Sequence, residues 1–229
     1  MMKNMMKTAC AIAVLAASTN VMAESVDVVV KGTIAPIACK ANILGGGVID
    51  YGVISPEALK ADDFTNLPVK STNLTITCDA PAKIALAVKN NRMGTVPGRP
   101  ALRNFDYPTA GAKLFGATNA ATLGLGMANE KAIGGWAAQF VNLKADNVDS
   151  KIISTDNSGS SWGTGVWMIP AYNKEYMSSI AKKDEMTPIA AKVFSYDINI
   201  EAYLNKSSEL DITKPAALDG SATIELVYL

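Results

Sequence analysis

Histidine is absent from the chain of 229 residues. Its absence excludes Ser-His-Asp and Cys-His catalysis and every metal site built on imidazole. Enzymes that use a Ser-Lys pair or paired carboxylates stay chemically open. However, no Ser-x-x-Lys stands at a predicted helix start, and Asp184-Glu185 follows two lysines in what is predicted to be a solvated loop. We therefore expect no enzymatic activity, no cofactor and no metal.

Long hydrophobic runs are also missing. The apolar run near the N-terminus, residues 8–17, is too short to span a bilayer. Lysines precede this run, and Val21-Met22-Ala23 follows it as a cleavage site with small residues. The pattern predicts a bacterial signal peptide over residues 1–23. We expect a soluble, exported mature chain of residues 24–229 that has no membrane span.

Neither sign of charge dominates the sequence. The chain has 21 Lys and Arg and 21 Asp and Glu. Because there is no basic patch, nucleic acid is not an expected partner. The mature chain is long enough for a domain with its own hydrophobic core, and no linker or internal repeat divides it. We predict a single domain over residues 24–229.

Cysteine is scarce, with three residues in the whole chain. Cys10 lies inside the predicted signal peptide, so cleavage leaves Cys39 and Cys78. Export would bring both into an oxidising compartment, where one disulfide bond is expected. Such a bond would constrain the unfolded chain by about 4 kcal/mol on the chain-entropy estimate. The alternative is a pair of free thiols.

Strand-like alternation is what the sequence has in abundance. In the clearest case, Lys192 to Leu204, apolar and polar residues alternate along the whole segment. This pattern rejects a helix and fits an antiparallel strand with one face in a core. Further strand-like segments are residues 26–34, 48–53, 73–78, 83–89, 136–143, 166–169 and 221–229.

Turn signals separate these segments. Asp79-Ala80-Pro81 is predicted to end the strand that contains Cys78, and Gly45-Gly46-Gly47 predicts a turn or bulge. Periodicity is weak between Met93 and Ala132, which indicates long connections with one or two short strands. Many short strands joined by Gly, Pro and Asn turns predict an all-β, antiparallel β-sandwich.

The two ends of the mature chain have complementary properties. At the C-terminus, one face of the last strand is formed by Ala222, Ile224, Leu226 and Tyr228. A strand at a free chain end is a template for pairing with another chain. At the N-terminus, Val26, Val28, Val30 and Ile34 form a candidate donor strand that could fill a groove in a neighbouring molecule.

Motifs at both ends resemble a known class of proteins. Lys31-Gly-Thr-Ile34 before Cys39, a second cysteine about 40 residues later and an aromatic next-to-last residue resemble pilin domains of chaperone–usher fimbriae. Residues 45–52, 71–81 and 219–229 resemble an enterobacterial family of exported fimbrial-like proteins with no assigned function. Residues 93–190 carry no matching motif.

The resemblance implies an Ig-like, pilin-type sandwich that is incomplete and is completed by a donated strand. It implies a Cys39–Cys78 disulfide and a C-terminal strand that pairs with a periplasmic fimbrial chaperone. The outer-membrane usher and other fimbrial subunits would be further partners in cell adhesion, and the protein would lie in the periplasm or in a fimbrium on the cell surface. Few residues precede Lys31, so either residues 26–34 are themselves the donor, or the protein donates no strand in this way.

Two alternatives remain open. Trp162 and Trp167 could stack on a glycan, although large aromatics more often fill cores or cover loops. The protein could also be a self-contained periplasmic module that binds or senses a small ligand or glycan. That alternative predicts a complete sheet, in which residues 24–34 pair within their own domain.

Overall fold

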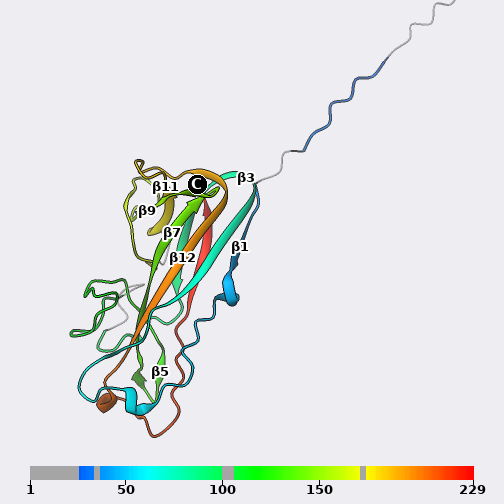
Figure 1. Ribbon diagram of the computed structural model, residues 1–229. Coiled ribbons are helices and arrows are strands. Elements are labelled where there is room, and N and C mark those ends of the chain that lie inside the picture. Colours follow the sequence, from blue (N-terminus) through cyan, green and yellow to red (C-terminus); the bar gives the residue numbers. More distant parts are fainter. Residues whose placement is uncertain (1–25, 34–36, 100–105, 171–173) are drawn as a thin grey trace, which may run out of the picture. The chain divides into compact units, whose positions relative to one another are not determined.

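The structure is a computed structural model that describes residues 26–33, 37–99, 106–170 and 174–229 (Figure 1). The chain divides into two units, Met1–Ala35 and Pro36–Leu229. In the first unit, the described residues 26–33 belong to no strand or helix. Val26, Val28 and Val30 are between 82% and 92% exposed. The predicted signal peptide and Ile34 lie outside the described residues.

The second unit is an all-β fold of two large antiparallel sheets that share one long strand, β3, with a separate two-stranded sheet of β5 and β6, and this confirms the predicted fold class. The first sheet runs β1-β3-β12-β7-β4, and the second runs β13-β3-β11-β9-β10. The strands are β1 Cys39–Ile43, β2 Thr65–Asn66, β3 Lys70–Asn90, β4 Leu123–Gly124, β5 Met127–Ala128, β6 Lys131–Ala132, β7 Gly134–Ala145, β8 Val148–Asp149, β9 Lys151–Thr155, β10 Gly163–Thr164, β11 Met177–Ala181, β12 Ala190–Leu204 and β13 Ala222–Tyr228. Short 3-10 turns span Leu44–Gly47, Pro56–Ala58 and Ser207–Glu209. No helix in the described ranges has the length and hydropathy that crossing a membrane requires.

The break predicted at Asp79-Ala80-Pro81 was wrong, because β3 continues through these residues. Its first half pairs with β1 and β12, and its second half pairs with β13 and β11. Where β3 passes from one sheet to the other, β12 has a register shift between Ala191 and Val193. A bulge bends a strand locally, and proline is tolerated at such irregular positions. Pro81 therefore marks a change of sheet within one strand.

The main core lies between the two sheets. On β12, the even-numbered residues Phe194 to Ile200 are buried and the odd-numbered residues Ser195 to Asn199 are half-buried, as the alternation predicted. The buried, even-numbered residues pack against Ile84, Leu86 and Val88 from the second half of β3. Residues from both sheets thus form one hydrophobic cluster, which is the defining feature of a sandwich.

A smaller core covers the outer face of the first sheet. Tyr203 is fully buried there, and its ring lies edge-on to Phe64 at 5.4 Å between centroids. Glu201 accepts hydrogen bonds from the side chain of Asn66, at 3.1 Å, and from the backbone N–H of Phe115. The chain between β3 and β7 is therefore fastened to β12 as a covering lobe.

After β1 the chain leaves the edge of β3. Gly45, Gly46 and Gly47 have φ values of 64°, 66° and 77°, a left-handed conformation that side chains disfavour. Nothing lies within 4 Å of where a Cβ would stand at Gly45 or Gly46, so backbone conformation, not crowding, requires glycine there. The strand predicted over residues 48–53 was consequently wrong, because these residues have no strand partner.

Tyr196 offers a test of the core. It is fully buried, and its hydroxyl has no hydrogen-bond partner in the described part of the chain. Burial raises the pKa of this phenol. Because a buried unsatisfied hydroxyl is unfavourable, Tyr196→Phe is expected to raise the free energy of unfolding by about 1 kcal/mol in urea titrations.

The matched control for this substitution is Tyr203→Phe. The Tyr203 hydroxyl lies 2.9 Å from Thr109 Oγ1 and accepts a hydrogen bond from the Thr109 N–H at 3.2 Å. Its removal is expected to lower the free energy of unfolding by about 1 kcal/mol. If Tyr196→Phe lowered the free energy of unfolding as much as the control does, the Tyr196 hydroxyl would have to have a hydrogen-bond partner.

Candidate functional site

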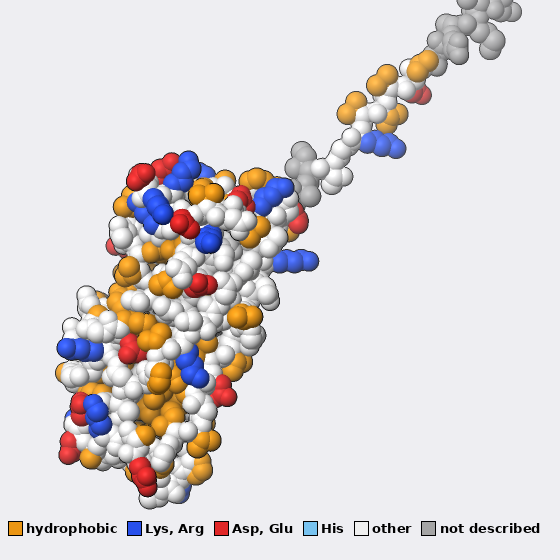
Figure 2. Space-filling view, viewed as in Figure 1, with side chains coloured by type: hydrophobic (Ala, Val, Ile, Leu, Met, Phe, Trp, Pro, Cys, Tyr) orange, Lys and Arg blue, Asp and Glu red, His pale blue; other side chains and the backbone are white. Residues whose placement is uncertain are grey.

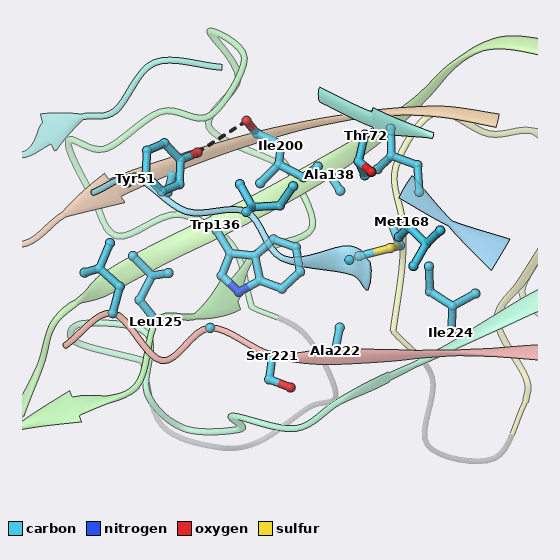
Figure 3. A pocket seen from close by; sticks show the side chains of 17 residues that line it. Tyr51, Thr72, Leu125, Trp136, Ala138, Met168, Ile200, Ser221, Ala222 and Ile224 are labelled. Atoms are coloured by element: carbon cyan, nitrogen blue, oxygen red, sulfur yellow. Dashed lines mark hydrogen bonds between the residues drawn. The ribbon is translucent and has the colours of Figure 1, made fainter. Parts of the chain in front are cut away.

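An apolar groove opens along one edge of the second unit, between β13 and the chain that follows β1 (Figure 3). Its cavity volume is about 250 Å³. In Figure 3, Trp136 lies at the centre, with Tyr51 and Leu125 on one side and Met168 and Ile224 on the other. The lining residues are Ile43, Gly47, Ile49, Tyr51, Thr72, Leu125, Trp136, Ala138, Met168, Ile198, Ile200, Ala202, Leu218, Gly220, Ser221, Ala222 and Ile224, none of which is charged.

One side of the groove is β13. It pairs with β3 from Ala222 opposite Asn90 to Tyr228 opposite Ile84. Its other edge has no strand partner among the described residues. Ala222 and Ile224 line the groove, and Leu226 packs against the main core beside it. Three of the four side chains predicted on one face of β13 therefore point to the main core. They lie next to the backbone edge of β13 that has no strand partner.

The fourth, Tyr228, is half-exposed and ties two edge strands together. Its hydroxyl accepts a hydrogen bond from the backbone N–H of Cys39 at 2.8 Å. The next residue, Leu229, donates its N–H to the carbonyl of Lys83 at 3.0 Å. Cys39 is also disulfide-bonded to Cys78, which confirms the predicted bond. β1 and β13 thus meet where β3 changes sheet.

The opposite side is residues 44–53, called the wall segment below. Ile49 and Tyr51 face the groove, whereas Leu44, Val48 and Val53 are 68%, 73% and 102% exposed. From Val48 to Gly52, alternate residues therefore point inward and outward, as in a strand, although the segment has no ladder. The alternation was readable in the sequence, but its role as the side of a groove was not.

Side chains from the first sheet hold the wall segment. Thr72 Oγ1 donates to the carbonyl of Leu44 at 3.0 Å, and Lys70 Nζ donates to the carbonyl of Asp50. The Tyr51 hydroxyl reaches the carbonyl of Ile200 at 3.5 Å, and the Lys70 ammonium lies 5.2 Å from the Tyr51 ring centroid. Desolvation, and then the charge of Glu201, raise the pKa of Tyr51 to about 12, so this hydroxyl keeps its proton at neutral pH.

Trp136 lies close to the chain that leads into β13. The Trp136 indole N–H donates to the carbonyl of Gly124 at 3.1 Å. A Cβ at Gly220 would lie 2.9 Å from that indole nitrogen, so only glycine allows this approach. Arg92 donates two hydrogen bonds, of 2.8 and 2.6 Å, to Asp219, and these bonds lower the pKa of the carboxyl group.

The two tryptophans considered for glycan contact pack in different clusters. Trp162 covers Ala85 and Ala87 on the second half of β3. The Trp167 ring lies 5.8 Å from Phe115 in the outer core. Both rings are half-buried, so each has a packing role, and glycan binding stays a prediction. In the described ranges, no three His, Cys, Asp or Glu are grouped as a metal site.

Comparisons with known proteins relate the chain to a family of unknown function and to two proteins of Escherichia coli. Residues 28–137, slightly less than half of the chain, match the model of a family described as "Protein of unknown function (DUF1120)". The chain is 29% identical to protein GltF of Escherichia coli, over 96% of this chain and 95% of that protein. It is 26% identical to the uncharacterized protein YhcF of the same organism, over 90% and 92% of the two chains. The family match includes β1, the wall segment, β3 and Trp136, but not Met168, β12 or β13, which also line the groove.

Proposed function

We propose that this protein is a fimbrial-type structural or accessory subunit that a periplasmic chaperone folds and that assembles by β-strand complementation. The observation that carries the proposal is the uncharged groove between the unpaired edge of β13 and the wall segment. A strand laid in this groove would gain backbone hydrogen bonds along β13 and bury alternate side chains between the sheets.

Hydrophobic burial would provide most of the affinity. Each aliphatic side chain that is fully buried contributes roughly 1.5–3 kcal/mol before ordering costs. Charge contributes little, because the groove lining has no charged residue and both signs are intermixed on the face shown in Figure 2. The partner is therefore expected to present an extended, apolar strand.

The described part of the N-terminal arm has the properties of such a strand. Val26, Val28 and Val30 alternate along the chain, are exposed and belong to no strand. In an assembled fimbria, the arm of one copy would enter the groove of the next subunit. Before assembly, a strand of the chaperone would occupy it, and the outer-membrane usher would exchange the two. The Cys39–Cys78 disulfide supports an oxidising compartment such as the periplasm.

Expression in a bacterial periplasm, with and without a co-expressed fimbrial chaperone, tests the proposal. We expect a one-to-one complex with the chaperone and a markedly higher yield of protease-resistant protein. In vitro, a synthetic peptide of residues 24–34 is expected to stabilise the refolded, oxidised protein by about 2.7 kcal/mol at a hundred times its Kd. The same peptide with Val28→Asp is the control.

A self-contained binding or regulatory module is the alternative, favoured by the half-buried Trp136 and Tyr51 in the groove. It predicts a stable, monomeric, protease-resistant protein without any chaperone, and no stabilisation by the peptide. Both results together would refute strand complementation. Thermal shifts with small glycans would then be the next measurement.

A further inference from the structure

The groove is too small for the strand that it is proposed to bind. An apolar cavity of roughly 150 Å³ holds one benzene molecule, so about 250 Å³ holds fewer than two such groups. Three valine side chains together with the strand backbone fill more than this volume, so a strand that buries all three enters only if one boundary of the groove moves. This step depends on the proposed function.

Most boundaries of the groove are fixed. Each of the seven residues of β13 is registered against β3, and Tyr228 and Asp219 are bonded at its two ends. Ala138 and Ile198 at the base of the groove belong to the main core and to paired strands. Moving either boundary would break a strand ladder or the core itself.

The wall segment has no strand ladder, although Ile49 packs against the main core and Tyr51 packs against the cluster of Leu67 and Leu125. Among the described residues, no backbone–backbone hydrogen bond joins residues 48–53 to another segment. Its hydrogen bonds to the first sheet come from the side chains of Thr72, Lys70 and Tyr51. Its outward residues are apolar and exposed, so moving outward separates few apolar contacts on that face.

Both ends of the wall segment have glycines suited to act as pivots. Gly45 and Gly46 at the first end and Gly52 at the second have φ values between 64° and 68°, with open space around each Cβ position. The flanking chain is anchored by the β1 ladder and the disulfide before it, and after it by Ile54 and Leu59, which pack against a hydrophobic cluster. Rotation at the glycines would move the segment without disturbing either anchor.

We infer that residues 44–53 form a hinged wall, with pivots at Gly45–Gly47 and Gly52, that swings outward to admit a donated strand. In the closed position, Tyr51 acts as a latch through its hydroxyl bond to Ile200 and its ring beside Lys70. The opening of the wall controls access to the groove, and Ile49 and Tyr51 return to pack on the strand that has entered.

The opening is measured by thiol labelling of Ala138→Cys, a groove residue that is fully buried while the wall is closed. In protein prepared without residues 1–23, which include Cys10, the two remaining native cysteines are bonded and do not react. In Gly46→Ala, the closed position of the wall holds an alanine in a left-handed conformation. This strain shifts the equilibrium from the closed to the open position by roughly tenfold. We expect labelling in the Gly46→Ala background to be faster by about this factor, and Tyr51→Phe to increase the rate less.

Gly116→Ala is the matched control. Gly116 has a φ of 75° and open space around its Cβ position, but it belongs to the covering lobe and not to the groove. Equal labelling rates in the Gly46→Ala and Gly116→Ala backgrounds would overturn the hinge. If Ala138→Cys fails to fold, acrylamide quenching of Trp136 in a Trp162→Phe, Trp167→Phe protein replaces the labelling, with the same expected order.

Binding of the 24–34 peptide separates this inference from the proposed function. If the wall limits entry, the association rate rises in Gly46→Ala and is unchanged in Gly116→Ala. Faster labelling without any peptide binding would support the hinge and count against strand complementation. Peptide binding with an unchanged association rate and unchanged labelling would keep the proposed function and overturn the hinge.

Discussion

Replacement of both Cys39 and Cys78 by alanine is expected to lower the free energy of unfolding by about 4 kcal/mol. The disulfide joins residues 39 positions apart in the sequence and links β1 to β3. β1 has β3 as its strand partner, and its other edge has none among the described residues. The bond therefore keeps an edge strand in place, and the wall segment and the hydrogen bond to Tyr228 both depend on that strand.

Urea unfolding of the oxidised protein and the double alanine variant measures this effect. With a slope of about 2–3 kcal/mol per molar, the midpoint should fall by about 1–2 M. Reducing agent should lower the midpoint of the natural protein similarly and leave the variant unchanged. A difference below about 1 kcal/mol would mean that the β1 ladder and core packing hold the strand without the bond.

Strands with one buried face could be predicted from the sequence. β12 has core residues at alternate positions and half-exposed polar residues between them, so its period of two is visible. β13 shows the same pattern more weakly, with Ala222, Ile224 and Leu226 against the core. The alternation arises because only one face of each segment meets the core.

Strands covered on both faces could not be predicted. Every residue of β11, Met177–Ala181, is buried, so its sequence shows no alternation. β9, Lys151–Thr155, lies beside it in the second sheet, and Trp162 and Met177 cover the outer face of β3 there. Short segments of this kind carry no periodic signal in their sequence, even though they form strands.

The groove depends on pairings between distant residues. Trp136 reaches its centre because β7 pairs with β12, with Trp136 opposite Ala202. Such a register cannot be read from either strand alone. Residues 48–53 were misassigned as a strand for a related reason: their alternation is real, but the predicted turn at Gly45–Gly47 leads them away from β3, so they have no partner to pair with.

Substitution of Ile224 by aspartate is expected to weaken binding of the 24–34 peptide by 100-fold or more. Ile224 lies in the middle of β13, lines the groove and packs against the main core. A donated strand would bury this position, and an unpaired carboxylate in a buried apolar site costs several kcal/mol. A cost of about 3 kcal/mol already corresponds to a factor above 100. Loss of the chaperone complex during co-purification is the matching expectation in the periplasm.

Thr223→Asp is the control, because Thr223 is the preceding residue on the same strand and is exposed. It introduces the same charge while the side chain points away from the groove, so binding should stay within about threefold of the natural protein. Ile224→Ala keeps the groove apolar and should weaken binding by about tenfold, which gives a second reading if the aspartate variant folds poorly. Equal affinities for Ile224→Asp and Thr223→Asp would show that the peptide binds elsewhere, since no strand could then lie between β13 and the wall segment.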